Sequence, residues 1–207
     1  MEIIKRTATP ITWKEVKELV EKGQHKAFFE VGDVIPVELK DGQNVRFVVA
    51  ELFDDSIAFV TEDCLKDRYF MNERWTNKGG WRDSAMRKYL NSEIYDLLPD
   101  ELKAVITDRT IKQEQGGEEL VSTDKLWLLS RTELTGSHYS ADKEDVHFSL
   151  FKDERSRVKQ VDGETWWYWL RSPSASNSAA FCYVNNGGNA SNNYAYSSAG
   201  VAFGFLI

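Results

Sequence analysis

The hydrophobic pattern changes its period along the chain, and its first part predicts a helix. Thr12 and Glu15 have the spacing of a capping box. Apolar residues then recur at helical spacing as far as Gly23, a residue that commonly ends a helix. The apolar side of this helix is expected to pack on the body through Trp13, Val16 and Val20. We therefore divide the chain into an N-terminal helical unit, 1–26, and a domain, 27–207.

The pattern that follows is typical of strands. Residues 32–39 read as a strand interrupted by Pro36, which indicates a sheet edge or a bend because proline cannot donate to a ladder. Two further strands are expected at 45–52 and 56–61, and an Asp-Gly turn at 40–43 precedes the first of them. Strands joined by such short turns predict an antiparallel meander.

The middle of the chain contains helix starts and irregular segments. A glycine-containing loop lies between Trp75 and Trp81. Capping residues at 83–84, and then Pro99, precede apolar residues at helical spacing, which predicts two short helices. Segment 112–119 is highly charged and contains adjacent glycines, so we expect an exposed hairpin loop there.

The last third of the chain mixes one polar segment with strand patterns. Residues 140–160 are polar and read as an irregular insert, whereas 126–130 and 165–171 are apolar and strand-like. The segment 200–207 is so apolar that we expect it to lie centrally in a sheet. The fold class predicted is α+β, with mixed antiparallel sheets and two or three helices.

Segment 180–185 alternates in polarity and leads into a turn at 186–189, where Asn-Gly-Gly-Asn is suited to positive φ. Successive side chains on a strand point to opposite faces. Val184 marks the core side of this strand, and Cys182 shares its face. The outward-facing residues would then be Phe181, Tyr183 and Asn185.

After Arg171 the chain contains no Lys, Arg, Asp, Glu or His, although it is rich in Asn, Ser and Tyr. Such residues give contact area and adaptable hydrogen bonds at low entropic cost, which is the composition of recognition loops. We therefore predict a ligand-binding region at 172–207, without catalytic or metal-binding residues. The expected ligand contacts are Ser176, Asn177, Ser178, Phe181, Tyr183, Asn185, Asn186, Asn189, Ser191, Asn192, Asn193, Tyr194, Tyr196 and Ser197.

Aromatic residues lead into this charge-free region. Trp166, Trp167 and Trp169 are expected to brace it from the core, with a sugar-stacking platform as the alternative. Arg171 is expected either to pair with a carboxylate inside the scaffold or to contact the ligand, because a buried guanidinium needs a partner.

The overall charge narrows the classes of partner. A net charge of -7 opposes nonspecific binding to nucleic acid or to anionic membranes. No apolar run is long enough to span a membrane. The N-terminus lacks the apolar core of a secretory signal, so we expect synthesis in the cytoplasm and leave the final location open. The partner expected is a protein or cell-surface ligand, and the oligomeric state stays open.

No cofactor is predicted. Cys64 and Cys182 have no metal-ligand spacing, and the simplest interpretation is two free, buried thiols. Asp142, Glu144 and Asp145 form an acidic stretch that could bind calcium. Their spacing is not that of a calcium-binding loop, so a solvated loop is the preferred interpretation.

Short elements along the chain, taken in order, resemble a bacterial and phage domain family of unknown function. The resemblance covers roughly Phe29 to Ile207. It rests on Trp81-x-x-Ser84-x-x-Arg87-x-Tyr89-Leu90-Asn91, Asp124-Lys125-Leu126-Trp127-Leu128-Leu129-Ser130-x-x-Glu133, Trp167-x-Trp169-Leu170-Arg171-Ser172-Pro173, and Gly200-Val201 before a hydrophobic end.

The charge-free region is itself similar to the variable region of proteins diversified by diversity-generating retroelements. Those proteins carry their variable region at the C-terminus of a C-type lectin fold and bind diverse ligands with it. The resemblance therefore implies a C-type lectin-like fold whose strands and loops at 172–207 form a diversified surface, in a phage or prophage setting. It also implies that template adenines are randomised, so that AAY codons for Asn become NNY codons. NNY codons cannot encode Lys, Glu, Gln, Met or Trp, and the region contains none of them.

Two classes of function follow from these observations. The first is a non-enzymatic binding protein of the receptor or adhesin type, in which a rigid scaffold carries interchangeable contact residues. A virion component with an exposed tip is compatible with this class. The alternative is a lectin-fold enzyme of the formylglycine-generating type, whose chemistry needs two reactive cysteines close in space. Cys64 and Cys182 would have to form that pair.

Overall fold

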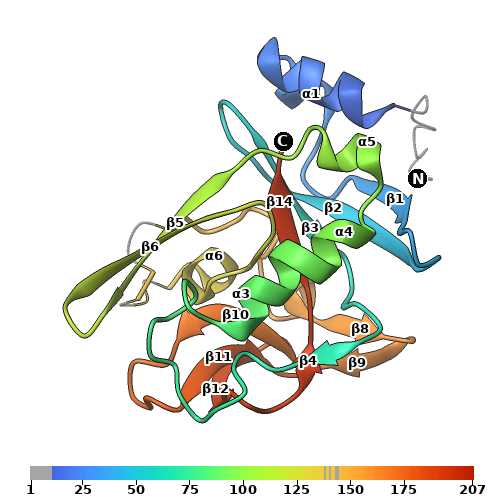
Figure 1. Cartoon of the computed structure of the whole chain (residues 1–207). Helices are drawn as coiled ribbons and strands as arrows, with labels where there is room; N and C mark the ends of the chain where they lie inside the picture. Colours follow the sequence, from blue (N-terminus) through green and yellow to red (C-terminus); the bar gives the residue numbers. More distant parts are fainter. Residues whose placement is uncertain (1–10, 138, 140, 143–144) are drawn as a thin grey trace.

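A computed structural model describes residues 11–207 except 138, 140, 143 and 144 (Figure 1). Two five-stranded sheets organise the chain, and the helices that cover them are short. Most strand pairs are antiparallel, and β10 and β13 pair in parallel. The prediction of a mixed α+β fold with antiparallel sheets and few helices is confirmed.

The N-terminal helix forms where the capping box predicts it. In α1 (Trp13–Glu21), the Thr12 hydroxyl accepts from the N–H of Glu15, and the Glu15 carboxylate accepts from the N–H of Thr12. Trp13 then packs edge-on against Phe59 and Phe205, with ring centroids 5.5 and 5.9 Å apart. A second short helix, α2 (His25–Phe28), follows it. The expected helix packed on the body through Trp13 is therefore confirmed.

The first sheet has the order β1-β2-β3-β14-β7, so the last strand of the chain lies between β3 and β7. Its strands are β1 (Val34–Glu38), β2 (Asn44–Leu52), β3 (Ile57–Thr61), β7 (Trp127–Leu128) and β14 (Phe203–Leu206). All residues of β3 are buried, as expected for a near-continuous apolar run inside a sheet. The predicted meander and the central position of the closing strand are both confirmed.

Helical turns from 85 to 97 cross the front of the molecule in Figure 1. They comprise α3 (Ala85–Tyr89), a π-helical turn (Leu90–Ile94) and α4 (Tyr95–Leu97), and α5 (Asp100–Lys103) follows. The Ser84 hydroxyl caps the start by accepting from the N–H of Arg87, at 3.1 Å. Both predicted helix starts are therefore present.

The charged segment 112–119 contains the predicted hairpin turn, but most of it is strand, so only the expectation of a loop over its whole length is wrong. It belongs to a hairpin of β5 (Arg109–Gln115) and β6 (Glu118–Asp124). Gly116 and Gly117 supply the turn, both with positive φ. Along each strand, buried residues alternate with exposed residues, which are charged or polar except for Val121. The buried positions include polar residues such as Gln113, which hides the alternation in the sequence.

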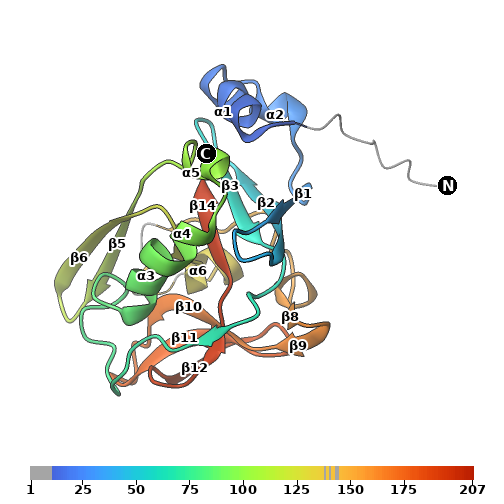
Figure 2. The ribbon, with the colours of Figure 1, turned by 45° about the vertical axis from the view of Figure 1, so that its right-hand side comes forward.

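The second sheet lies at the opposite end of the molecule from α1, as both views show (Figures 1 and 2). Its order is β12-β11-β10-β13-β4. The strands are β4 (Arg68–Tyr69), β10 (Tyr168–Pro173), β11 (Ala180–Val184), β12 (Ala190–Tyr194) and β13 (Ala199–Gly200). A small hairpin of β8 (Lys159–Val161) and β9 (Glu164–Trp166) precedes β10. The charge-free region thus supplies most of this sheet.

The facing predicted for β11 is only partly correct. Cys182 and Val184 are buried as expected, and Tyr183 is half-buried. Phe181 is fully buried, so its assignment to the outer face is wrong. β11 lies between β10 and β12 and is covered on both faces at Phe181, whereas strict alternation holds only where one face is open to water.

Before β10, the chain forms a short helix and an insert that packs against the core. α6 (Arg131–Thr135) begins with a second capping box, formed by Ser130 and Glu133. The polar insert 140–160 includes a short 3-10 turn (Arg155–Arg157) and two fully buried rings, Phe148 and Phe151. The insert therefore packs on the body and is fixed by buried aromatic residues.

Candidate functional site

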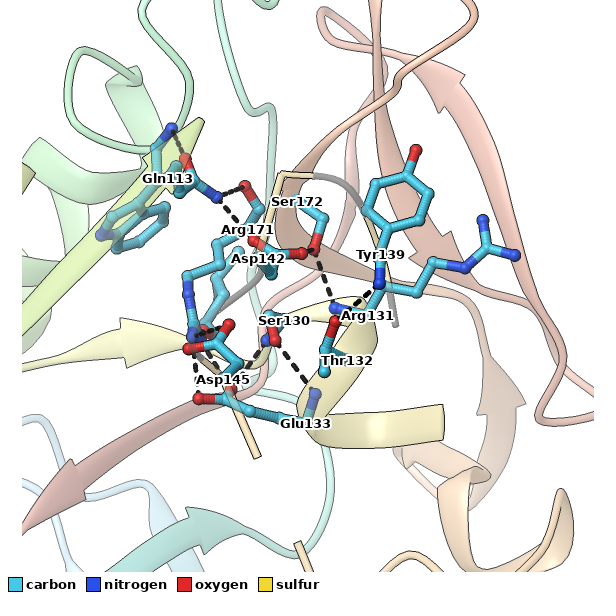
Figure 3. Close-up of polar contacts among 12 residues, drawn as sticks. Gln113, Ser130, Arg131, Thr132, Glu133, Tyr139, Asp142, Asp145, Arg171 and Ser172 are labelled. Atoms are coloured by element: carbon cyan, nitrogen blue, oxygen red, sulfur yellow. Dashed lines mark hydrogen bonds and ion pairs between the residues drawn. The ribbon is translucent and has the colours of Figure 1, made fainter. Parts of the chain in front are cut away.

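A buried ionic cluster holds the start of the charge-free region to the body. Arg171 on β10 has no exposed surface. Its two Nη atoms contact the two carboxylate oxygens of Glu133 at 2.6 and 2.7 Å, and Nη2 also contacts Asp145 at 2.7 Å (Figure 3). Bidentate pairing of this kind gives both strength and a fixed geometry. The expectation of a carboxylate partner inside the scaffold is confirmed, and no part of the side chain reaches the surface.

Glu133 joins this cluster to the capping box of α6. One oxygen accepts from the N–H of Ser130, and the other is also paired with Arg109. Burial raises the pKa of Glu133, but Arg109 and Arg171 more than compensate and lower its pKa to about 2. The carboxylate is therefore ionised at neutral pH and fixes the helix to β10.

Asp142 closes the cluster on its other side. Its carboxylate accepts from the hydroxyl of Ser172 and from Nε2 of Gln113, the latter at 3.0 Å. Burial raises the pKa of Asp142 to about 6, and burial also raises the pKa of Asp145. A solvated loop is therefore the wrong interpretation for Asp142 and Asp145, and Glu144 lies outside the described residues. Both carboxylates tie the insert to β10.

The buried ionic cluster is one brace of the charge-free region. The loop between Trp75 and Trp81 supplies a second brace. Asn77 is buried, and its amide nitrogen donates to the carbonyls of Ser174, Asn177 and Ala180 at 3.1, 3.1 and 2.9 Å. Gln115 on β5 donates in turn to the backbone and side-chain oxygens of Asn77, at 2.9 and 3.0 Å. These bonds fix the backbone of the 174–180 loop, while the side chains of 175–178 remain exposed at the surface.

Most of the predicted ligand contacts lie at the surface of the second sheet and its loops. Phe181 is the exception, because it is fully buried. Four others are half-buried, namely Tyr183, Asn185, Asn193 and Ser197. The exposed positions are Ser176, Asn177, Ser178, Asn186, Asn189, Ser191, Asn192, Tyr194 and Tyr196.

An exposed aromatic cluster forms where this surface meets the 72–80 loop. Trp75 is 62 % exposed and stacks on Tyr196 with ring centroids 4.6 Å apart and an interplanar angle of 4°. The ring centroid of Tyr194 lies 5.1 Å from that of Trp75. Trp75 was not among the predicted contacts. The sequence shows only that Trp75 stands beside a glycine-containing loop, because its aromatic partners lie more than a hundred residues away in sequence.

The turn after β11 uses its side chains for structure. Asn185 Oδ1 accepts from the N–H groups of Gly187 and Asn189, at 2.9 and 3.0 Å. Gly188 has a φ of 85°, and a Cβ there would lie 1.8 Å from the carbonyl oxygen of Glu154. Asn185 therefore shapes the turn, and Asn186 also donates to the carbonyl of Thr165 at 3.0 Å. Asn186 and Asn189 are both exposed.

The two cysteines are free thiols with different neighbours. The thiol of Cys182 donates to Oδ1 of Asn192 at 3.2 Å, whereas Cys64 lies against Gly200. Burial raises the pKa of Cys182 to about 11 and that of Cys64 to about 12. Reactive cysteines have the opposite shift, because the thiolate is the nucleophile.

Within the described part of the chain, no group of three or more His, Cys, Asp or Glu residues is arranged to hold a metal ion. The described helices also include none that is long and apolar enough to cross a membrane.

A family model described as "Domain of unknown function (DUF6273)" matches residues 54–207. The chain belongs to this family. Searches of curated proteins and of solved structures found no match. Both braces, the exposed aromatic cluster and the whole charge-free region lie inside the DUF6273 segment, whereas α1, α2, β1 and β2 precede it.

Proposed function

We propose that this DUF6273 protein is a non-enzymatic ligand-binding protein of the receptor or adhesin type, whose region 172–207 is its recognition surface. The observation that carries the proposal is the exposed cluster of Trp75, Tyr194 and Tyr196 beside uncharged Asn and Ser side chains. Tyr and Trp are the residues that most often anchor binding interfaces, because they bring large contact areas at low entropic cost.

The two braces support a division between scaffold and contact residues. The Arg171–Glu133 pair and the Asn77 amide hold the backbone on either side of the 174–180 loop through atoms that lie inside the molecule. Exposed side chains such as Ser191 can then change with little effect on folding. A rigid scaffold with replaceable contacts lowers the entropic cost of binding.

We propose further that the scaffold is C-type lectin-like and that a diversity-generating retroelement varies the region, in a phage or prophage. Support comes from the closing strand inside the first sheet and from the residue alphabet of 172–207. Most apolar residues of this region are buried, and most of its Asn, Ser and Tyr residues are exposed or half-buried. Sequencing the neighbouring DNA tests this directly. A near-copy that differs at adenines, beside a reverse transcriptase gene, is expected, and its absence would remove the retroelement from the proposal.

Binding is tested by replacing Trp75, Tyr194 and Tyr196 together with Ser. The probes are a displayed library of linear peptides and an array of glycans, each presented to the wild-type chain. We expect the triple variant to bind the selected probe at least about tenfold more weakly, a loss of about 1.4 kcal/mol or more, with a nearly unchanged melting temperature. Phe28→Ser is the matched control, because Phe28 is an exposed aromatic residue on α2, at the other end of the molecule (Figure 2).

Two results would contradict the proposal. Equal binding by the wild type and the triple variant would show that this surface does not bind the probe. Unfolding of the triple variant would show that the three rings belong to the core. Thiol titration addresses the formylglycine-type alternative. We expect slow reaction of Cys64 and Cys182, whereas a fast-reacting pair would favour the enzyme.

A further inference from the structure

β12 is an open edge of the second sheet and lacks the devices that usually protect a sheet edge. It stands at the end of the strand order and pairs with β11 from Ala190 to Tyr194 in regular register. Unpaired N–H and C=O groups on an edge can pair with another chain, and natural proteins block them with charges, proline or bulges. The sequence of β12, Ala-Ser-Asn-Asn-Tyr, contains neither a charged residue nor proline.

Other strands of similar length at sheet edges do carry such devices. β1, the edge of the first sheet, contains Pro36 and Glu38. The β5–β6 hairpin carries charged residues on both strands, including Lys112 and Glu119. At the far edge of the second sheet, β4 is only two residues long. Among the described strands of five or more residues at an edge, β12 is the one without protection.

The hydrogen bonds at both ends of β12 show which backbone groups point outward. Asn185 donates to the carbonyl of Asn189, and Ala195 donates to the carbonyl of Ala179, each at 2.9 Å. In an antiparallel pair, residues that exchange hydrogen bonds alternate with residues that do not. The alternation places Ser191 and Asn193 in bonds to β11. The N–H and C=O groups of Ala190 and Asn192 therefore point away from it.

The open part of the edge ends at Tyr194. Its N–H donates to Oδ1 of Asn193 at 2.8 Å, and its carbonyl accepts from the N–H of Ser197 at 3.0 Å. What remains is a ladder of two donors and two acceptors on Ala190 and Asn192, beside the exposed rings of Tyr194 and Trp75. Donors and acceptors at strand spacing match the backbone of another polypeptide, whereas a glycan has no such repeat.

We propose that the edge of β12 accepts an extended segment of a partner protein as an additional strand. The proposal rests on the binding function proposed above and names the class of ligand. Backbone bonds to Ala190 and Asn192 would supply affinity that does not depend on side-chain identity. Specificity would come from side chains of the added strand that pack on Tyr194 and Trp75, and from the exposed Ser and Asn positions.

A pair of substitutions at one position separates backbone recognition from side-chain recognition. Asn192→Ala removes the side chain and keeps the N–H, whereas Asn192→Pro also removes the N–H. Proline is tolerated on an edge strand where the N–H faces outward. Both variants lose the bond from the Cys182 thiol equally. The probe is the linear peptide that a displayed library selects on the wild-type chain.

We expect Asn192→Pro to bind this peptide at least about tenfold more weakly than Asn192→Ala, because only the proline variant lacks the outward N–H. Ser191→Lys, which adds a protecting charge to the exposed edge, should weaken binding in the same way and keeps the proposal testable if the proline variant does not fold. N-methylation of successive peptide residues should abolish binding at every second position.

Each other outcome overturns the proposal. Equal losses in Asn192→Ala and Asn192→Pro would assign recognition to side chains. Glycan binding that depends on Trp75 and Tyr194, with no peptide selected, would leave the binding function standing and remove the added strand. Self-association of the wild type that Asn192→Pro prevents would assign the edge to a second copy of the chain. Failure of all probes to bind would count against both proposals.

Discussion

The substitution Asp142→Asn tests the charge balance of the buried cluster that supports the proposed recognition surface. The guanidinium groups of Arg109 and Arg171 face three carboxylates in this cluster, those of Glu133, Asp142 and Asp145. One negative charge is therefore in excess inside the protein. Protonation of Asp142 removes this excess charge most easily, because burial raises the pKa of its carboxyl to about 6. The amide of Asn resembles the protonated acid in shape and is always neutral.

The sign of the effect follows from the direction of the shift. The folded state binds the Asp142 proton more tightly than an ordinary Asp with a pKa of 3.8 does, so this group favours folding below about pH 4 and loses that contribution as pH rises through about 6. A shift of about two units corresponds to about 3 kcal/mol, of which about 2 kcal/mol develops between about pH 4 and pH 7.5. The pKa of Glu133 is shifted in the opposite direction, so its contribution to the unfolding free energy is lost as pH falls through about 2.

Urea unfolding followed by tryptophan fluorescence measures this effect across the pH range. We expect the unfolding free energy of Asp142→Asn, relative to the wild type, to rise by about 2 kcal/mol from about pH 4 to pH 7.5. Asp67→Asn removes the same charge from an exposed position and is the matched control. A difference between Asp142→Asn and the wild type that stays constant with pH would refute the argument from buried charge.

Two further substitutions test the braces. Arg171→Met leaves Glu133 buried without its bidentate partner and should lower the unfolding free energy by about 3–5 kcal/mol, whereas adding Glu133→Leu should recover part of the loss; no recovery would contradict the charge argument. Asn77→Ala removes the donor to three carbonyls of the 174–180 loop and should cost about 1–3 kcal/mol. Amide exchange should then quicken in that loop, and unchanged exchange would show that the loop is held by other contacts.

Local signals in the sequence were sufficient for much of the secondary structure. The capping box at Thr12 forms as expected, because its hydrogen bonds join residues three positions apart, and Ser130 begins a second box with the same spacing. The turn before β12 follows from Asn and Gly residues suited to positive φ. The apolar end of the chain lies inside a sheet because every side of such a strand must be buried.

Signals that depend on distant partners were missed. The strands of the β5–β6 hairpin do not stand out in the sequence because their buried face includes Gln113, whose partners are Asp142 and the backbone of Arg171. Alternation predicts an outward Phe181, but the ring is buried, because alternation does not reveal that a strand is covered on both faces. Asp142 and Asp145 look like surface residues until the fold brings Arg171 and Ser172 beside them.

For region 172–207, the sequence alone determined the composition: a region without charges, rich in Asn, Ser and Tyr, after Arg171. Only the tertiary structure decided how those residues are used. The stacking of Trp75 on Tyr196 and the hydrogen bonds of Asn77 join loops about a hundred residues apart in sequence. The open edge of β12 likewise follows from the strand order of the folded sheet, which the sequence does not show. Composition is a local property, whereas exposure and pairing depend on which segments the folded chain brings together.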